Sequence, residues 1–300
     1  MSPLSREWEP PWRCSIALNL AGLRRGSGDP TYRIVEDGHW IGMRTPIGPA
    51  TLHLTKTEDH VVGRAWGEGA PWALETMPAL LGAEDDPSGF VPQHRVLESA
   101  WRRFGHWRVA KTQRVWEALA PAIIEQKVTG QEAYRGFRNL VIRHGERAPG
   151  PLVNLWIQPS AETVRSIPSW AWLQMHIDPP RSKALVTAAR YAQKLEARQH
   201  DTVLVDETLR ALPGLGVWTS AEVRQRALGD ADAVSFGDYH VAPNIGWALT
   251  GTPIDDAALE ELLEPWRPHR YRVQALVALA GLNRPRRGPR MAPRTHLPAR

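Results

Sequence analysis

The chain has 300 residues, a net charge of +5 and a single cysteine. Six arginines lie in residues 283–300, which contain no acidic residue, so residues 1–282 carry a net charge of −1 and the overall charge is weak evidence for a nucleic-acid partner. One cysteine excludes a disulfide framework, and no apolar run approaches the roughly 18 residues that cross a membrane. These features favour a monomeric cytoplasmic protein with no membrane segment.

The first part of the chain is predicted to be rich in strands, over residues 12–67. Strand-like runs at Thr31–Val35 and His39–Arg44 flank Glu36-Asp37-Gly38, which is a hairpin signal. Pro49–Thr55 and His60–Ala65 are interpreted as two further strands. Cys14–Leu23 is interpreted as a strand rather than a signal peptide, and Trp72–Leu81 as a helix against the sheet.

The pattern changes to helices after the turn Asp85–Gly89. Ala110–Gln126 has helical periodicity, and Thr129-Gly130-Gln131-Glu132 is a capping-box signature for a helix through Ile142. Pro149-Gly150-Pro151 is read as a linker. Further helices are expected at Ala161–Ser166, Ser182–Ala197, Leu204–Ala211, Thr219–Leu228, Tyr239–Leu249, Asp255–Leu263 and Arg270–Leu282. The Pro- and Arg-rich residues 283–300 are predicted to be a disordered tail.

The most informative motif is Leu212-Pro213-Gly214-Leu215-Gly216-Val217-Trp218-Thr219. Pro213 interrupts the preceding helix because it lacks an N–H donor, and Gly214 and Gly216 permit a tight turn. The N–H groups near Gly214, Gly216 and Trp218 then lie at a helix N-terminus, where a phosphate binds well. Taken alone, the motif fits an ordinary helix–helix turn as well.

A carboxylate follows the hairpin about twenty residues later. Asp238 follows the short apolar run Val234–Gly237 and stands where a helix N-cap is expected. An N-cap aspartate is more often structural than catalytic. Near a helix N-terminus, however, its negative charge suits an oxocarbenium-like transition state, as in glycoside cleavage. Asp230 and Asp232 are rival acids in a polar turn.

Two other segments fit contact with DNA or a structural role equally well. Gln126, Lys127 and Val128 lie at the junction of two expected helices, where they are exposed enough to touch a ligand. The second segment is basic and has no acidic residue; its cations bind phosphate or line a solvated helix face. They are Arg102, Arg103, Arg108, Lys111 and Arg114.

Together, these residues resemble the helix-hairpin-helix DNA glycosylase superfamily, and within it DNA-3-methyladenine glycosylase II. The resemblance spans roughly residues 30–282. Besides the hairpin, it rests on Phe236–Val241, Ala122–Thr129, Ala65–Gly69, Leu80–Gly82 and Pro265–Pro268. It implies an α+β fold in which a small antiparallel sheet domain (1–90) precedes a mostly α-helical body (91–282). Two subdomains of that body would flank the active-site cleft.

The resemblance also implies roles for single residues. Asp238 would be the catalytic carboxylate, and Trp218 and Tyr239 would approach the base pocket. Contacts to DNA would come from Gln126, Lys127, Val128, Gly214, Gly216 and Thr219. The backbone carbonyls of Arg210, Leu212 and Leu215 would bind a monovalent cation.

Four departures from the family pattern bear on function. Lyase-type members carry a hairpin lysine where this chain has Trp218, so no Schiff base forms there and a monofunctional enzyme is implied. The iron–sulfur cluster of some relatives needs four cysteines, which this chain lacks. Lys127 follows Gln126 where the wedge is typically apolar, so Gln126, Lys127 and Val128 each remain candidates for it. Glu222 replaces a pocket tyrosine and leaves the substrate range open.

The sequence therefore predicts a nucleoid-associated enzyme that flips and excises alkylated purines such as 3-methyladenine from duplex DNA. One alternative is a monofunctional glycosylase for deaminated or oxidised bases. Another is a non-catalytic DNA-binding protein that uses the hairpin alone. Asp238 distinguishes a glycosylase from the non-catalytic alternative, because a pure DNA-binding protein gains little from a carboxylate near phosphates.

Overall fold

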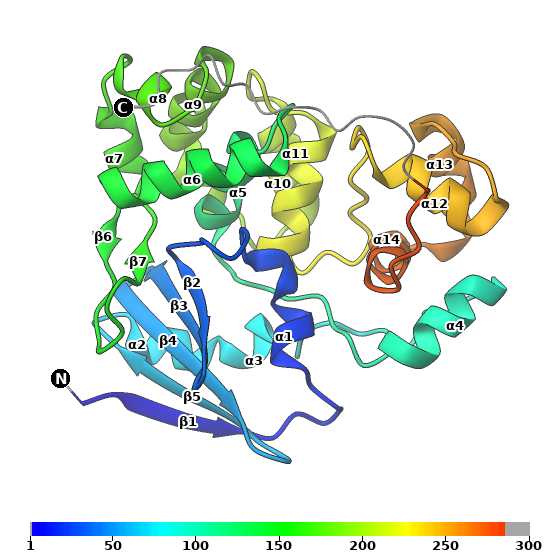
Figure 1. The fold of residues 1–300 in the computed structure, drawn as a ribbon, viewed down its shortest axis with the longest axis horizontal. Helices are drawn as coiled ribbons and strands as arrows, with labels where there is room; N and C mark the ends of the chain where they lie inside the picture. The colour runs from blue at the N-terminus through cyan, green and yellow to red at the C-terminus, as the bar shows by residue number, and fades with distance from the viewer. Residues whose placement is uncertain (1, 286–300) are drawn as a thin grey trace.

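The computed structural model describes residues 2–285. Met1 and residues 286–300 lie outside the described residues, and with them most of the predicted disordered tail. Every helix in residues 2–285 is too short or too polar to cross a membrane. The architecture is α+β, as expected: an antiparallel sheet is followed by a mostly helical body (Figure 1).

The sheet has five antiparallel strands in the order β1-β5-β4-β3-β2. Its central register pairs Ile41 with Leu52 and Leu52 with Ala65, so these apolar side chains share the face that the helices α2 (Ala70–Glu75) and α3 (Met77–Leu80) cover. The strands are β1 (Leu4–Trp8), β2 (Tyr32–Val35), β3 (Gly38–Thr45), β4 (Gly48–Lys56) and β5 (Val61–Trp66). The four expected strands from Thr31 to Ala65 are thus confirmed, whereas the mostly exposed edge strand β1 was not predicted.

The expected strand at Cys14–Leu23 is wrong. This segment forms a short helix, α1 (Ile16–Asn19), and a 3-10 turn, Ala21–Leu23. The Ser15 side chain caps α1 by accepting from the Leu18 N–H, and buried Asn19 donates to the Leu81 carbonyl at 2.7 Å. A serine cap and a long-range polar contact therefore outweigh the apolar run.

The expected helix at Trp72–Leu81 is two helices. They are α2 (Ala70–Glu75) and α3 (Met77–Leu80), which meet at Thr76. Pro78 lies in the first turn of α3, where its missing N–H costs nothing, but its ring disfavours an uninterrupted helix from α2.

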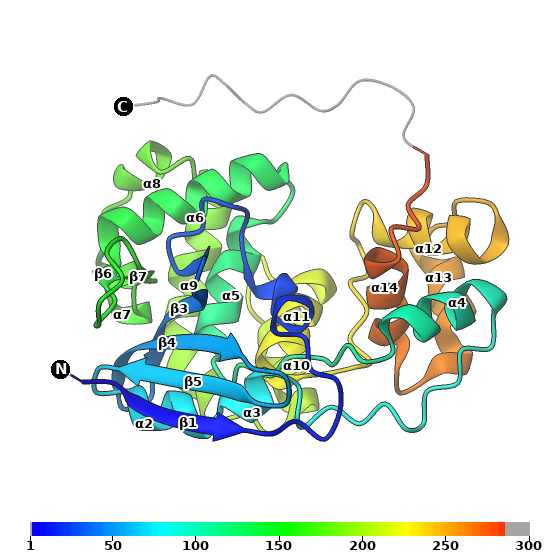
Figure 2. The same ribbon diagram turned by 60° about the horizontal axis from the view of Figure 1, so that its bottom comes forward.

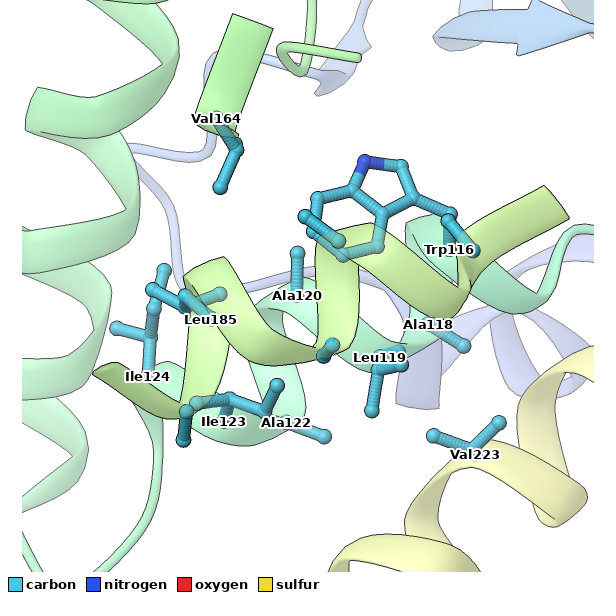
Figure 3. Packing of buried hydrophobic residues seen from close by; sticks show 14 of the residues in the cluster. Trp116, Ala118, Leu119, Ala120, Ala122, Ile123, Ile124, Val164, Leu185 and Val223 are labelled. Carbon is cyan, nitrogen blue, oxygen red and sulfur yellow. The ribbon is translucent and has the colours of Figure 1, made fainter. Parts of the chain in front are cut away.

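The helical body surrounds α5 (Val115–Ile124), every residue of which is buried except Glu117. Figure 3 shows Leu119 of α5 and Val223 of α11 pointing toward one another. Around α5 lie α6 (Gly130–His144), α7 (Ala161–Ser166), α8 (Ala171–Gln174), α9 (Pro179–Glu196), α10 (Thr202–Arg210), α11 (Val217–Val223), the π-helical turn η2 (Arg224–Leu228) and the hairpin of β6 (Glu146–Arg147) and β7 (Trp156–Ile157).

Two details of the body refine the sequence prediction. The capping box at Thr129 and Glu132 is present at the start of α6. The helix expected over Ala110–Gln126 begins only at Val115, because residues 110–114 are non-helical and Gln113 has a positive φ of 54°.

A second helical lobe combines distant parts of the chain. Figures 1 and 2 both show α4 (Arg95–Phe104) beside α12–α14. Leu97 of α4 shares a buried core with Ile245, Leu263 and Leu276. The C-terminal elements are α12 (Val241–Thr250), α13 (Asp256–Leu263), the 3-10 turn Glu264–Trp266 and α14 (Arg270–Leu279). The segment from η2 to α12, which carries Asp238, therefore links the body to this lobe.

Burial makes the thiol of Cys14 unreactive in the folded protein. Cys14 is 1% exposed, and desolvation raises its pKa to about 11 despite nearby Lys56 and Arg108. We expect less than 0.1 equivalent of thiol to react with Ellman's reagent at pH 8 before unfolding, and about one equivalent in denaturant. Stoichiometric reaction of the native protein within minutes would contradict this burial.

Candidate active site at the helical hairpin

The hairpin lies between α10 and α11. Its turn is closed by hydrogen bonds from the Leu212 N–H to the Leu209 carbonyl (3.0 Å) and from the Leu215 N–H to the Leu212 carbonyl (3.1 Å). Gly214 has a φ of +84°, a conformation that favours glycine. Gly216 is the N-cap of α11 and has no side-chain cap; a Cβ there would meet no atom within 4 Å.

The open N-terminus of α11 suits an anion. The N–H groups of the first helical turn have no acceptor within the helix, and they point along its axis together with the positive end of the helix dipole. Gly214, Gly216 and Val217 are exposed and the space beside Gly216 is open, which leaves room for a phosphate at this turn. On the other side of the turn, the Leu212 carbonyl already accepts one hydrogen bond. Ligation of a cation by the carbonyls of Arg210, Leu212 and Leu215 stays a prediction.

Asp238 bridges the hairpin helix and the start of α12. Its Oδ2 accepts a hydrogen bond from the Trp218 indole N–H at 3.1 Å. Its Oδ1 accepts from the backbone N–H groups of His240 (2.7 Å) and Val241 (3.2 Å). The expectation that Asp238 is the N-cap residue is wrong, because His240 occupies that position. Gly237, with a φ of +84°, turns the chain so that Asp238 caps the helix from two residues upstream.

The two residues expected at the base pocket lie in different environments. Trp218 is half-buried and contacts Asp238 directly. The Tyr239 side chain is 87% exposed, and its ring packs edge-on against His240 with centroids 4.9 Å apart. The structure therefore brings Trp218 to the carboxylate and leaves Tyr239 at the surface beside it.

The junction of α5 and α6 is attached to the hairpin through Gln126. The Gln126 amide nitrogen donates to the Gly214 carbonyl at 3.0 Å and to the Thr219 hydroxyl at 2.8 Å. Lys127 is exposed and has a φ of +53°, while Val128 is half-buried. The sequence analysis predicted that both Gln126 and Thr219 contact DNA, but it gave no sign that they contact each other, since they lie 93 residues apart.

The basic segment from Arg102 to Arg114 does not form a single cationic surface. Lys111 pairs with Glu84 at 2.6 Å, and buried Arg114 pairs with Glu117. The Arg108 guanidinium lies 5.3 Å from the ring centroid of Trp12. A structural role for these three cations is therefore favoured over phosphate binding.

A large hollow in the described chain lies away from Asp238. Its volume is about 790 Å³, and it lies between α1, the β2–β3 turn and the end of α4. Arg103 lines this hollow, but none of the candidate site residues does. The candidate active site is therefore placed at Asp238, where the acid, the indole and the hairpin meet, and not at this hollow.

Comparison with solved structures places the fold among known proteins. A 3-methyladenine DNA glycosylase from Archaeoglobus fulgidus matches 92% of this chain and 98% of its own, with a TM-score of 0.79 and 15% identity. The fold is that of DNA glycosylases. An 8-oxoguanine glycosylase/lyase from Clostridium acetobutylicum matches 93% of this chain and 98% of its own, with a TM-score of 0.71 and 10% identity.

A third structure contains DNA. A 3-methyladenine DNA glycosylase from Schizosaccharomyces pombe, in complex with abasic DNA, matches 63% of this chain and 93% of its own, with a TM-score of 0.51 and 16% identity. No protein-family model and no curated protein matches the sequence. Enzymes for alkylated and for oxidised bases thus share this fold, so the fold alone does not select the substrate.

Proposed function

We propose that this protein is a monofunctional DNA glycosylase that excises alkylated purines, such as 3-methyladenine, from duplex DNA. The contact between the Trp218 indole and the Asp238 carboxylate at the hairpin carries the proposal. It joins an anion-binding helix end, an aromatic surface and an acid in one place. The shared fold with DNA glycosylases supports it.

Binding uses the hairpin and the α5–α6 junction. The open N–H groups at Gly214, Gly216 and the start of α11 hold a phosphate, and Arg210, Leu212 and Leu215 offer carbonyls to a monovalent cation beside it. Lys127 and Val128 contact the duplex at the junction. Gln126 contributes by fixing the hairpin relative to that junction. The damaged nucleotide leaves the base stack, at an unstacking cost of a few kcal/mol.

Asp238 carries the chemistry. As the bond between C1′ and the base nitrogen breaks, its electron pair leaves with the base and positive charge develops on the sugar. The carboxylate stabilises that charge and orients a water, whose oxygen bonds to C1′ and whose proton passes to solvent. An alkylated purine is already cationic, so it departs as a neutral base without prior protonation.

Trp218 stacks on the base and restricts the enzyme to base removal without strand cleavage. Its indole ring offers a stacking surface to a cationic base, a contact of about 0.5–2 kcal/mol. It has no amine, so it forms no Schiff base with the sugar. The product is therefore an abasic site in an uncut strand. Tyr239, exposed next to Asp238, would approach the flipped nucleotide from the DNA side.

A panel of lesions tests this assignment. Purified protein is incubated with duplexes that carry methylated purines, hypoxanthine or 8-oxoguanine, and abasic sites are scored by alkaline cleavage. We expect the fastest excision from methylated duplex and no strand cleavage without alkali. Faster excision of 8-oxoguanine would instead favour the oxidised-base alternative. This lesion is included because the fold also matches that of an 8-oxoguanine glycosylase/lyase. Tight binding without any excision would favour a non-catalytic protein.

Gln126→Ala is expected to weaken binding to an abasic duplex by about tenfold. The substitution removes two hydrogen bonds to the hairpin, each contributing about 0.5–1.5 kcal/mol, and so loosens the phosphate site. Gln131→Ala, on the exposed start of α6, is the matched control and should bind like the wild type. Fluorescence anisotropy measures both. Equal affinities of the two variants would show that Gln126 does not organise the hairpin.

A further inference from the structure

Four buried or half-buried charged side chains cluster beside the candidate active site. We call Arg25, Glu125, Glu222 and Arg226 the charged floor. The Arg25 Nε lies 3.5 Å from Glu125 Oε1, and the Arg226 Nη1 lies 2.7 Å from Glu222 Oε2. Arg226 also donates to the Gly22 carbonyl at 2.9 Å, so the floor joins η2 to the N-terminal domain. Burying such groups is costly unless they are paired, which these contacts achieve.

Glu222 is the member of the charged floor nearest to the candidate catalytic residues along the chain. It lies on α11 four residues after Trp218, so the two side chains share one helix face about 6 Å apart along the axis. Its Oε1 accepts a hydrogen bond from the Ser235 hydroxyl at 2.7 Å. Ser235 in turn accepts the Asp238 N–H through its carbonyl at 3.2 Å. Trp218 and Glu222 therefore face the same segment, Ser235–Asp238.

In this arrangement Glu222 is buried, whereas Trp218 and Asp238 are half-buried. The sugar of a flipped nucleotide must lie at Asp238 for its bond to be cut, and the base extends from it past Trp218. One helical turn along the same face from Trp218, the next side chain is that of Glu222. Glu222 is only 8% exposed, so water competes weakly for its oxygens.

The chemistry of Glu222 restricts what it can recognise. An ionised carboxylate only accepts hydrogen bonds, and its two oxygens offer about four acceptor positions. Ser235 and Arg226 donate to two of them. The remaining positions suit an N–H donor on a base and repel a carbonyl oxygen. Adenine carries an amino group at the position where its deaminated form, hypoxanthine, carries a carbonyl.

We propose that Glu222 accepts a hydrogen bond from the amino group of the flipped base, and thereby selects alkylated adenine over deaminated adenine. This inference rests on the proposed glycosylase function and names a specificity residue within it. Arg226 and Ser235 act as positioning residues, because they hold the two oxygens of Glu222. A purely structural ion pair would stabilise the fold without affecting the choice of base.

Glu222→Gln tests the proposal through a ratio of rates. Single-turnover release of 3-methyladenine from methylated duplex, and of hypoxanthine from a matched duplex with one hypoxanthine, is measured for the wild type and the variant. A glutamine amide can turn its N–H toward the hypoxanthine oxygen, so we expect the preference for the amino-bearing base to fall about tenfold or more. Glu125→Gln is the matched control: it neutralises the other carboxylate of the floor, and the ratio should stay at the wild-type value.

Three outcomes overturn the proposal. If Glu222→Gln folds and excises with the wild-type ratio, Glu222 has no part in base selection, although the glycosylase function stands. If both variants change the ratio equally, the effect belongs to the floor as a structure. If the wild type excises neither base, the proposed function fails and this inference fails with it. Should Glu222→Gln unfold, Glu222→Asp withdraws the carboxylate by one methylene, and the same loss of preference is expected.

Discussion

Asp238→Asn is expected to lower base excision by about a thousandfold while binding to damaged duplex stays within about twofold of the wild type. The variant removes the negative charge that stabilises the developing positive charge on the sugar. It retains a side-chain oxygen for the N–H groups of His240 and Val241, so the start of α12 should stay capped. Single-turnover excision and fluorescence anisotropy on the same duplex separate the two effects.

A second acid on the same link is the control for this experiment. Asp230 pairs with Arg224 at 3.5 Å, and its Oδ1 accepts the Asp232 N–H at 2.8 Å, so it is engaged in local structure. Asp230→Asn should therefore excise at the wild-type rate. If Asp238→Asn also excised at that rate, Asp238 would be a helix cap and the candidate active site would be wrongly placed.

Asp85→Ala is expected to reduce the free energy of unfolding by about 3–5 kcal/mol, because it leaves a buried arginine unpaired. The Arg272 Nη2 lies 2.6 Å from Asp85 Oδ1, and the two side chains are 0% and 3% exposed. The Nε and Nη1 of Arg272 are buried without a hydrogen-bond partner, so Asp85 supplies the compensation for this charge. Asp85 also accepts the Val109 N–H at 3.0 Å, which ties the segment after α3 to the segment between α4 and α5.

The neighbouring acid provides a contrast for the stability measurement. Glu84 is half-exposed and pairs with Lys111 at the surface, where an ion pair contributes about 0–1 kcal/mol. Urea unfolding followed by tryptophan fluorescence should therefore place Glu84→Gln close to the wild type and Asp85→Ala far below it. A loss of under 1 kcal/mol for Asp85→Ala would show that Arg272 finds other compensation, such as ordered water.

Local signals in the sequence predicted the parts of this fold that neighbouring residues determine. The capping box at Thr129 and the glycine turn at Gly214 depend on residues a few positions apart, and both are present. The placement of α4 beside α12–α14 and the ion pair between Asp85 and Arg272 depend on residues more than 100 positions apart. No periodicity or spacing encodes such contacts.

In the candidate site, too, the features that depend on neighbouring residues were predicted and the contacts between distant residues were not. The hairpin and the acid were expected from their motifs, and the structure brings Trp218 and Asp238 within hydrogen-bond distance. The Asp238 prediction missed the N-cap by two residues, because Gly237 turns the chain before the helix begins. The attachment of Gln126 to the hairpin was missed altogether, since an amide at a helix junction carries no signal about its distant partner.

Release of free 3-methyladenine from methylated duplex DNA by the full-length protein is the most direct test of the proposed function. Chromatography of the released bases, with strand integrity followed in parallel, reports the reaction without any variant. We predict release of the methylated base and a strand that breaks only after alkali. Binding of the same duplex with no base released would contradict the glycosylase assignment and leave a DNA-binding protein on a glycosylase fold.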